Sequence, residues 1–386
     1  MSEPARENLE RAISFAAPDI TEDEIDAVVR VLRSGWITTG EECFELEREL
    51  AEYLGAPHVV SMSSCTAALE TAFGWLDLPA GSRVGVPTWT FVATALAPMK
   101  YGLQPVLLDI DDETLNASPE AVKAALADGL DALVIVHFGG VPVDASIHQM
   151  CADAGVPVVE DAAHALGAMD DRGRISGLGS VGACLSFYAT KNLTSAEGGA
   201  LVTHDPDLAE FARAYRFHGM SRDAWARYGP GQESGYELIA PGIKANLPDV
   251  LAALARSQLR RFDDMQEARA RLADRYRMRL DNVAGVRCHP ATKVPGTANH
   301  LMVVSLPENV DRSRVAHTLD GVGVSSSVHF QPLHAFRMLA QRCEVGPAGL
   351  PVADSLAAHV LSLPLHLGMD DSDIDRVCDV LLAELH

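Results

Sequence analysis

Apolar and polar residues along this chain follow two periods, one typical of strands and one typical of helices. Five short apolar runs suit buried strands, at residues 83–86, 105–108, 132–136, 156–159 and 181–187. Helix-start signals lie between them, such as the cap-then-proline pair Ser118-Pro119 and the cap residue Asp144. This alternation predicts an α/β protein in which parallel strands are joined by helical crossovers into a doubly wound sheet.

The first fifty residues differ from this central part. Thr21 and Glu24 have the capping-box spacing, and the apolar periodicity that follows predicts a helix that stops at Ser34-Gly35. The segment 36–40 then forms a turn-like linker with one tryptophan and two threonines. A second amphipathic helix is predicted to run to about Leu54.

The last third of the chain changes pattern again. Pro248 opens a long helical stretch to about Leu280, charged on its exposed face, which we interpret as a connector. Beyond it the pattern predicts a strand at 300–306, a helix at 311–319, a strand at 322–328 and a helix at 370–385. We predict a large domain with its N-terminal segment over residues 1–250, and the connecting helix with a small C-terminal α/β domain over residues 251–386.

Composition narrows the function class. The 386 residues include 53 acidic and 31 basic side chains, for a formal charge of −22, which argues against nucleic acid and anionic membrane as partners. No apolar run approaches the ~20 residues that span a bilayer. The N-terminus lacks the basic-then-apolar order of a signal peptide, and the seven scattered cysteines show no C-x-x-C spacing. We therefore predict a cytoplasmic protein.

Two familiar kinds of site motif are excluded, one by its context and one by its absence. Residues 177–182 fit G-x-G-x-x-G, but they precede a predicted strand, whereas the dinucleotide fingerprint follows a strand and opens a helix. We interpret them as a glycine-rich turn. Metal-ligand spacings such as H-E-x-x-H do not occur, so no metal site is predicted.

Lys191 is the first candidate for chemistry. It follows the apolar run 181–187 and lies among small and hydroxylated residues. A lysine just past a buried strand can be held out of water, where its amine loses its proton more easily and becomes a nucleophile. Taken alone, an ordinary exposed loop lysine is the favoured interpretation, because most lysines are exposed.

Other residues give Lys191 a chemical context. Asp161 ends another predicted strand, thirty positions before Lys191. Pyridoxal 5'-phosphate (PLP) chemistry requires such a pair, a carboxylate for the pyridine nitrogen and a lysine for the Schiff base. Ser64-Cys65-Thr66 at a helix start, together with Ser186, would hold the phosphate. Trp89 would stack on the ring. Each has a plainer alternative as a helix cap or a core residue, but jointly they favour a PLP site.

These residues resemble a known family, the DegT/StrS-type sugar-nucleotide aminotransferases, which have the aspartate-aminotransferase fold (fold type I). The resemblance covers nearly the whole chain, at residues 34–40, 160–164, 186–192, 329–330 and 362–366. It implies a mostly parallel doubly wound sheet in a large domain, a smaller C-terminal α/β domain, and a homodimer with active sites shared between the subunits.

The resemblance also implies roles for individual residues. Lys191 would be the Schiff-base lysine, Asp161 the partner of the pyridinium, and His164 would reach the phenolic oxygen of the cofactor. The remaining cofactor contacts would be Ser64, Cys65, Thr66, Trp89, Ser186 and, from the neighbouring subunit, Asn246. Substrate contacts are expected from Trp36, Thr38, Lys244, His329 and Phe330. Cys65 stands where relatives more usually have glycine or alanine, and Lys244-Ala245-Asn246 departs from a common Gly-Tyr-Asn pattern.

The implied reaction is a ping-pong transamination. L-Glutamate would convert PLP to pyridoxamine 5'-phosphate (PMP), which then aminates a ketone on a nucleotide-linked sugar during deoxyaminosugar biosynthesis for a natural-product glycoside or cell-surface glycan. The segment 36–40 and His164 resemble the branch that acts at C-4, including on UDP-4-ketopentoses. Candidates for binding the anionic substrates are Arg213, Arg216, Arg222, Arg227 and Lys244.

Three alternatives remain open at this point. One is amination of a 3-keto sugar. A second is a PLP- or PMP-dependent sugar dehydratase, although related dehydratases have histidine where this chain has Lys191. A third is a regulatory binding protein on the same fold, which need not retain Asp161, Lys191 and both phosphate elements together.

Overall fold

An eight-stranded sheet forms the centre of the molecule. The computed structural model describes residues 11–221 and 237–385. The strands are β1 (His58–Met62), β2 (Arg83–Pro87), β3 (Gln104–Leu108), β4 (Ala132–Val136), β5 (Val158–Asp161), β8 (Gly182–Ser186), β9 (Gly199–Thr203) and β12 (Glu344–Val345). Their order is β1-β9-β8-β5-β4-β2-β3-β12, and β9 alone runs antiparallel to its neighbours. The α/β prediction with a mostly parallel sheet is therefore confirmed.

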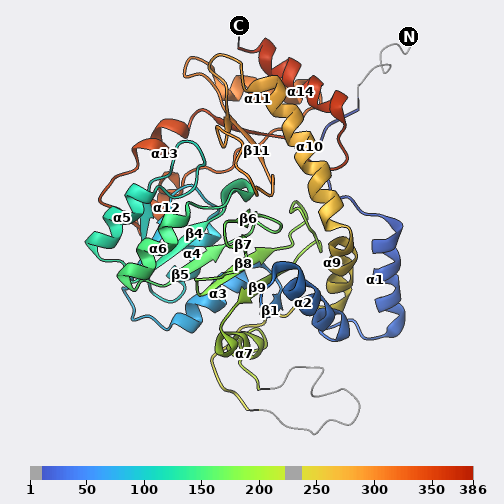
Figure 1. Ribbon diagram of the computed structural model, residues 1–386, viewed down its shortest axis with the longest axis vertical. Helices are drawn as coiled ribbons and strands as arrows, with labels where there is room; N and C mark the ends of the chain where they lie inside the picture. The colour runs from blue at the N-terminus through green and yellow to red at the C-terminus, as the bar shows by residue number, and fades with distance from the viewer. Residues whose placement is uncertain (1–10, 222–236, 386) are drawn as a thin grey trace, which may run out of the picture.

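Helices cover both faces of this sheet (Figure 1). On one face lie α3 (Cys65–Leu76), α4 (Ala93–Met99) and α7 (Pro206–Tyr215). On the other lie α2 (Glu41–Leu54), α5 (Pro119–Asp128), α6 (Ala145–Ala154) and α9 (Asp249–Arg260). Strand residues alternate between the two cores, so that Val134 packs with the first group and Leu133 and Ile135 with the second. Helix α1 (Glu22–Ser34) packs outside α9.

The C-terminal part of the chain forms a second, smaller sheet with its own helices, at the top of Figure 1. Helix α10 (Phe262–Leu280) leads into a three-stranded antiparallel sheet of β10 (Arg287–His289), β11 (Met302–Ser305) and β13 (Val360–Leu363). Helices α11 (Arg312–Gly321) and α14 (Asp371–Ala383) share a core with it. The predicted boundary near residue 250 stays a prediction.

The remaining elements within residues 11–221 and 237–385 are short. They are β6 (Met169–Asp170), β7 (Gly173–Arg174), α12 (Arg337–Ala340), α13 (Pro351–Leu356) and the 3₁₀ turns Phe138–Gly140 and Leu333–Ala335.

Two sequence predictions were wrong in this region. The stretch predicted as one long helix is divided into α9 and α10 at Arg261, whose guanidinium is turned toward Asp19 and Glu24 beside α1. Residues 322–328, predicted as a strand, form only isolated bridges, Val324 with Ile13 and Ser327 with Ser362. Because the segment divides its hydrogen bonds between two partners, it builds no continuous ladder.

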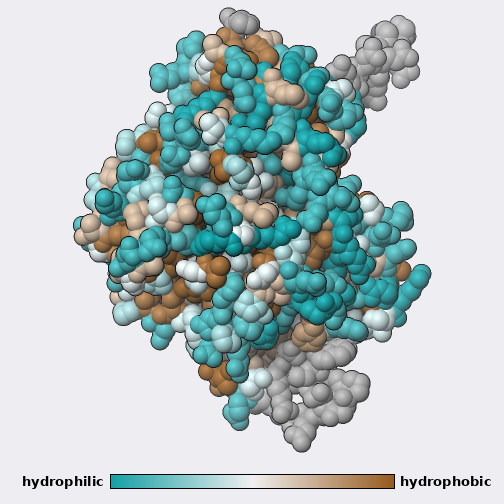
Figure 2. Space-filling view, viewed as in Figure 1, coloured by the Kyte–Doolittle hydropathy of each residue, from teal (hydrophilic) through white to brown (hydrophobic). Residues whose placement is uncertain are grey.

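Within the two described ranges, no helix is both long and apolar enough to cross a membrane. The face in Figure 2 is largely hydrophilic, with apolar residues in small groups.

Candidate active site

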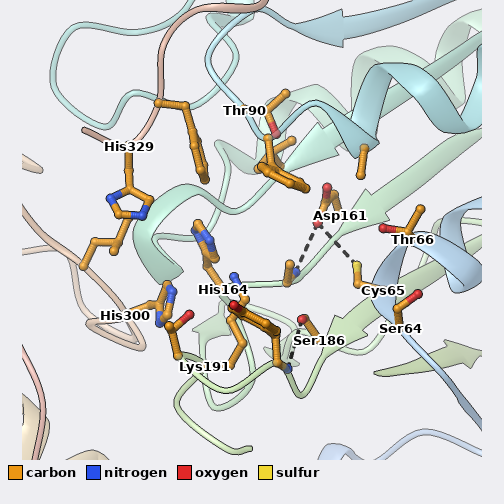
Figure 3. A pocket seen from close by; sticks show the side chains of 18 of the residues that line it. Ser64, Cys65, Thr66, Thr90, Asp161, His164, Ser186, Lys191, His300 and His329 are labelled. Carbon is orange, nitrogen blue, oxygen red and sulfur yellow. Dashed lines mark hydrogen bonds between the residues drawn. The ribbon is translucent and has the colours of Figure 1, made fainter. Parts of the chain in front are cut away.

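A cavity of about 380 Å³ opens where β5 and β8 end. The sheet side and its helices contribute Ser64, Cys65, Thr66, Asp161, His164, Ser186 and Lys191, and the C-terminal part contributes His300, His329 and Phe330. Figure 3 shows the Ser64–Thr66 segment on one side of this space, with His300 and His329 opposite. Nine of the fourteen residues predicted for the site therefore line one cavity.

Asp161 lies at the end of β5 with three donors around its carboxylate. The Thr94 hydroxyl donates to Oδ2 at 2.8 Å, and the backbone N–H of Ala163 donates to Oδ1 at 3.2 Å. The Cys65 thiol lies 3.7 Å from Oδ1 and 3.2 Å from the Cys184 carbonyl oxygen. Burial raises the pKa of this thiol well above its usual value, so the thiol stays protonated and acts as a donor. The carboxylate is thus held in one orientation.

An anion cradle faces Asp161 at the start of α3. Ser64 caps this helix by accepting from the N–H of Ala67, and Ser186 contributes a hydroxyl from the end of β8. Strand β9 packs directly against the helix start, because a Cβ on Gly199 would lie 2.5 Å from the Ser64 carbonyl carbon and 2.6 Å from the Cys65 nitrogen. Free N–H groups, the helix dipole and hydroxyls together suit a phosphate.

Lys191 lies in the loop 187–198 between β8 and β9. This loop is tied at its base, because Phe187 N–H donates to Gly198 O and Ser195 N–H donates to Phe187 O, both at 2.9 Å. The surrounding protein removes water from the amine and lowers the pKa of Lys191 to about 8, although Cys65 and Asp161 act in the opposite direction. Near neutral pH the amine therefore needs little energy to become a nucleophile.

Three histidines form the wall beside Lys191. The ring of His164 lies 4.3 Å from that of His300, centroid to centroid. Burial, with Lys191 nearby, lowers the pKa of both imidazoles well below the usual value and that of His329 to about 4. Gly139 N–H donates to His164 Nδ1, which places the proton of neutral His164 on Nε2. The wall is thus uncharged at neutral pH.

His300 and its partner Asn192 were missed by the sequence analysis. Asn192 Oδ1 accepts a hydrogen bond from His300 Nδ1–H at 2.9 Å, and the Asn192 amide donates to Ala298 O. Asn192 follows Lys191 directly in the chain, but no spacing connects it with a residue 108 positions later.

The prediction for Trp89 was wrong. Its side chain is 0% exposed and packs in the core below the cavity, where Nε1 donates to the His329 carbonyl at 3.0 Å. Phe91, two residues on, is 57% exposed and lines the cavity. The chain after β2 thus turns the larger ring inward and leaves the smaller one to face the space above Asp161.

Four further predicted residues lie outside this cavity. They are Trp36, Thr38, Lys244 and Asn246. Asn246 donates from its amide to the Thr39 hydroxyl at 2.7 Å and accepts from Lys244, which also lies over the ring of Phe217. Trp36 Nε1 donates to Thr39 O. The structure therefore gathers these residues into a second group around Thr39.

The predicted basic cluster is only partly available to anions. Arg216 is 2% exposed and is bound to Glu47 at 2.6 Å, so it is a structural residue and not an anion site. Arg213 is half exposed, 3.9 Å from Glu47. Arg222 and Arg227 lie outside the described residues.

Sequence comparison then identifies the family. Residues 18–382 match the DegT/DnrJ/EryC1/StrS aminotransferase family. The chain belongs to this family. It is 37% identical over 375 residues to the spore coat polysaccharide biosynthesis protein SpsC of Bacillus subtilis (strain 168), which covers 96% of each chain.

Solved structures agree with this assignment. Spr1654 of Streptococcus pneumoniae in its PLP form is 27% identical, covers 97% of this chain and 99% of its own, and gives a TM-score of 0.87; a PMP form is also known. DesI in the presence of its TDP-sugar product is 29% identical, covers 98% and 94%, and gives a TM-score of 0.85. The protein is a sugar aminotransferase of fold type I, and the PLP and PMP forms imply PLP as the cofactor.

The cavity fits PLP by the chemistry of its groups. The phosphate of PLP would bind in the cradle at the start of α3. Gly199 lacks the Cβ that would block the close packing of β9 against this helix start. The buried carboxylate of Asp161 would pair with the protonated ring nitrogen of PLP, and the Lys191 amine would react with its aldehyde. When bound, PLP supplies an electron sink for a carbanion at the amino carbon.

The lowered pKa of Lys191 is open to a direct test. In the cofactor-free protein, labelling of Lys191 by an amine-selective acylating reagent should rise with pH and reach half its maximum near pH 8, because only the neutral amine reacts. Peptide mass spectrometry at a series of pH values measures this midpoint. In urea-unfolded protein the midpoint should return to about 10.4. A midpoint near 10 in the folded protein would contradict the assignment.

Proposed function

We propose that this protein transfers the amino group of L-glutamate to C-4 of a nucleotide-linked 4-keto sugar, with UDP-4-ketopentoses among the candidates. The observation that carries the proposal is the Lys191 amine facing the same cavity as the Asp161 carboxylate and the anion cradle. DesI, with its TDP-sugar product, supports a nucleotide-linked substrate. SpsC supports a place in glycan biosynthesis.

The residues divide the work of the reaction. Asp161 would hold a positive charge at the ring nitrogen. Lys191 would bind the cofactor covalently through its amine and, once released as a neutral amine, would move the proton that leaves the amino carbon of the donor. His164, neutral with its proton on Nε2, would donate a hydrogen bond to an oxygen on the ring.

The sugar is proposed to lie against the C-terminal wall of the cavity. Phe330 contacts Phe91, Phe138 and His164 with ring centroids 5.9–6.0 Å apart. His329 is positioned by a stacked contact with Phe15 at 5.1 Å. Such a wall offers flat apolar surface and a few imidazole groups, as a sugar with few free hydroxyls needs.

The protein is further proposed to act as a homodimer with shared sites. The group around Thr39, with Trp36, Thr38, Lys244 and Asn246, lies away from the cavity of its own chain. Lys244 and Asn246 offer an ammonium and an amide on the surface that would meet the phosphates in the cavity of a second subunit.

A mixing experiment tests the shared site. Lys191→Ala and Asn246→Ala chains, each nearly inactive alone, should regain up to about a quarter of wild-type activity when mixed at equal amounts, because half of the dimers are mixed and each carries one intact site. Activity after unfolding and refolding the mixture together is the measurement. Each variant refolded alone is the control, and no recovery in mixtures that form dimers would count against sharing.

The substrate assignment is tested with a panel of nucleotide-linked 3-keto and 4-keto sugars offered with L-glutamate. Formation of 2-oxoglutarate and of the aminosugar with a 4-keto member is the expected result. Amination of 3-keto members alone would place the reaction at C-3. Loss of a sugar hydroxyl without 2-oxoglutarate would indicate a dehydratase, and no turnover with any member would favour a binding protein.

A further inference from the structure

A chain of two buried threonine hydroxyls leads to the Asp161 carboxylate. Thr94, on the first turn of α4, is 0% exposed and donates from Oγ1 to Asp161 Oδ2 at 2.8 Å. Thr90, four residues earlier and ahead of the helix, is 2% exposed, and its Oγ1 lies 2.8 Å from Thr94 Oγ1. Thr90 lines the cavity above Asp161 (Figure 3).

The direction of both hydrogen bonds follows from proton counting. An ionised carboxylate can only accept hydrogen bonds, so the single hydroxyl proton of Thr94 must be donated to Asp161. The bond between the two hydroxyls is then donated by Thr90 and accepted by Thr94. Each bond polarises the next, and the positive ends of both O–H dipoles point toward the carboxylate.

This arrangement is not what a buried helical threonine usually does. Its hydroxyl commonly donates back to the carbonyl four residues earlier, as Thr71 in α3 does to Ala67 O at 2.7 Å. Thr94 directs its proton out of its own helix, to the one carboxylate at the end of β5 that faces the cavity. The neighbouring Glu160 points to the opposite face, where its carboxylate lies 3.2 Å from His137 Nε2.

We propose that Thr94 is a positioning residue of the reaction, supported by Thr90, which fixes the orientation and negative charge of Asp161 toward the ring nitrogen of the cofactor. This inference rests on the proposed function, in which Asp161 pairs with that nitrogen. Oδ2 is held by a side chain of α4 and Oδ1 by the backbone of Ala163, so the plane of the carboxylate is set from two elements.

The test compares PLP with 1-deaza-PLP, an analogue in which the ring nitrogen is replaced by carbon and no pyridinium forms. Binding to the full-length apoprotein is measured by absorbance titration for the wild type, Thr94→Val, Thr94→Ser and Thr90→Val. Thr71→Val is the matched control, because it removes a buried helical hydroxyl with no contact to Asp161. Thermal unfolding of each variant reports its stability.

Thr94→Val should bind PLP about 10-fold to 100-fold more weakly, the range for a hydrogen bond to a charged group, and should bind the deaza analogue within about 3-fold of wild type. Thr90→Val should lose about 2-fold to 10-fold for PLP alone, and Thr94→Ser should restore wild-type binding. Thr71→Val should change neither affinity.

Two outcomes would overturn the inference: unchanged PLP binding by Thr94→Val, or an equal loss for both cofactors, which would mark Thr94 as merely structural. The proposed function fails separately, if the wild type itself binds PLP no better than the deaza analogue.

Discussion

Lys191→Ala should abolish transamination, lowering kcat by on the order of 10⁴-fold or more, since it removes both the covalent attachment and the group that moves the proton. The cavity around it should persist, because the loop 187–198 is held by its own backbone hydrogen bonds and not by the lysine side chain. The measurement is formation of 2-oxoglutarate from L-glutamate in a single half-reaction, with borohydride reduction to trap cofactor bound to the protein.

The matched control is Lys293→Ala, at an exposed lysine that forms an ion pair with Asp274. It should keep full activity and the trapped cofactor. If Lys191→Ala still carried reduced cofactor covalently, another residue would have to be the Schiff-base lysine, and the central assignment would be wrong.

Asp161→Asn should lower kcat by on the order of 10² to 10³-fold, the factor expected when one partner of a buried charge pair is removed. Asparagine keeps the size, but its single carbonyl oxygen can accept from only one of the two donors, Thr94 or Ala163, so the change removes the negative charge together with one of these hydrogen bonds. The loss should fall on the chemical step, and thermal unfolding should show a folded protein. Steady-state kinetics of the glutamate half-reaction measure the effect.

Glu160→Gln is the control for this change. Glu160 precedes Asp161 on the same strand but faces the other side of the sheet, bound to His137. It should lose stability and keep most of its activity. Equal losses of kcat in both variants would show that the end of β5 tolerates no charge change at all, and Asp161 would then have no special role.

Much of the fold followed from local signals in the sequence. The five apolar runs became strands of the central sheet because such runs have few alternatives when helices flank them. Lys191 and Asp161 met because parallel neighbouring strands bring their carboxyl ends to one edge. The strand wrongly predicted at 322–328 is the opposite case, since Val324 and Ser327 form bridges with two segments distant in the sequence, which a local pattern does not reveal.

The site was predicted less completely than the fold. Trp89 and Phe91 both follow β2, and the local sequence does not show which of the two rings turns into the core. His300 and Thr94 reach the site through helix and loop positions that depend on tertiary packing. The group around Thr39 was named by resemblance, and a single chain does not bring it to the cavity.

The antiparallel direction of β9 fixes both ends of the loop that carries Lys191. Because β9 runs against β8, the loop 187–198 leaves the sheet and re-enters it at the same edge, between the paired residues Ser186 and Gly199. A parallel β9 would have needed a crossover, leaving Lys191 on a segment anchored near the cavity at one end only. Closing so short a loop costs little chain entropy. The antiparallel strand thus gives the Lys191 amine a high effective molarity toward a cofactor bound in the cavity.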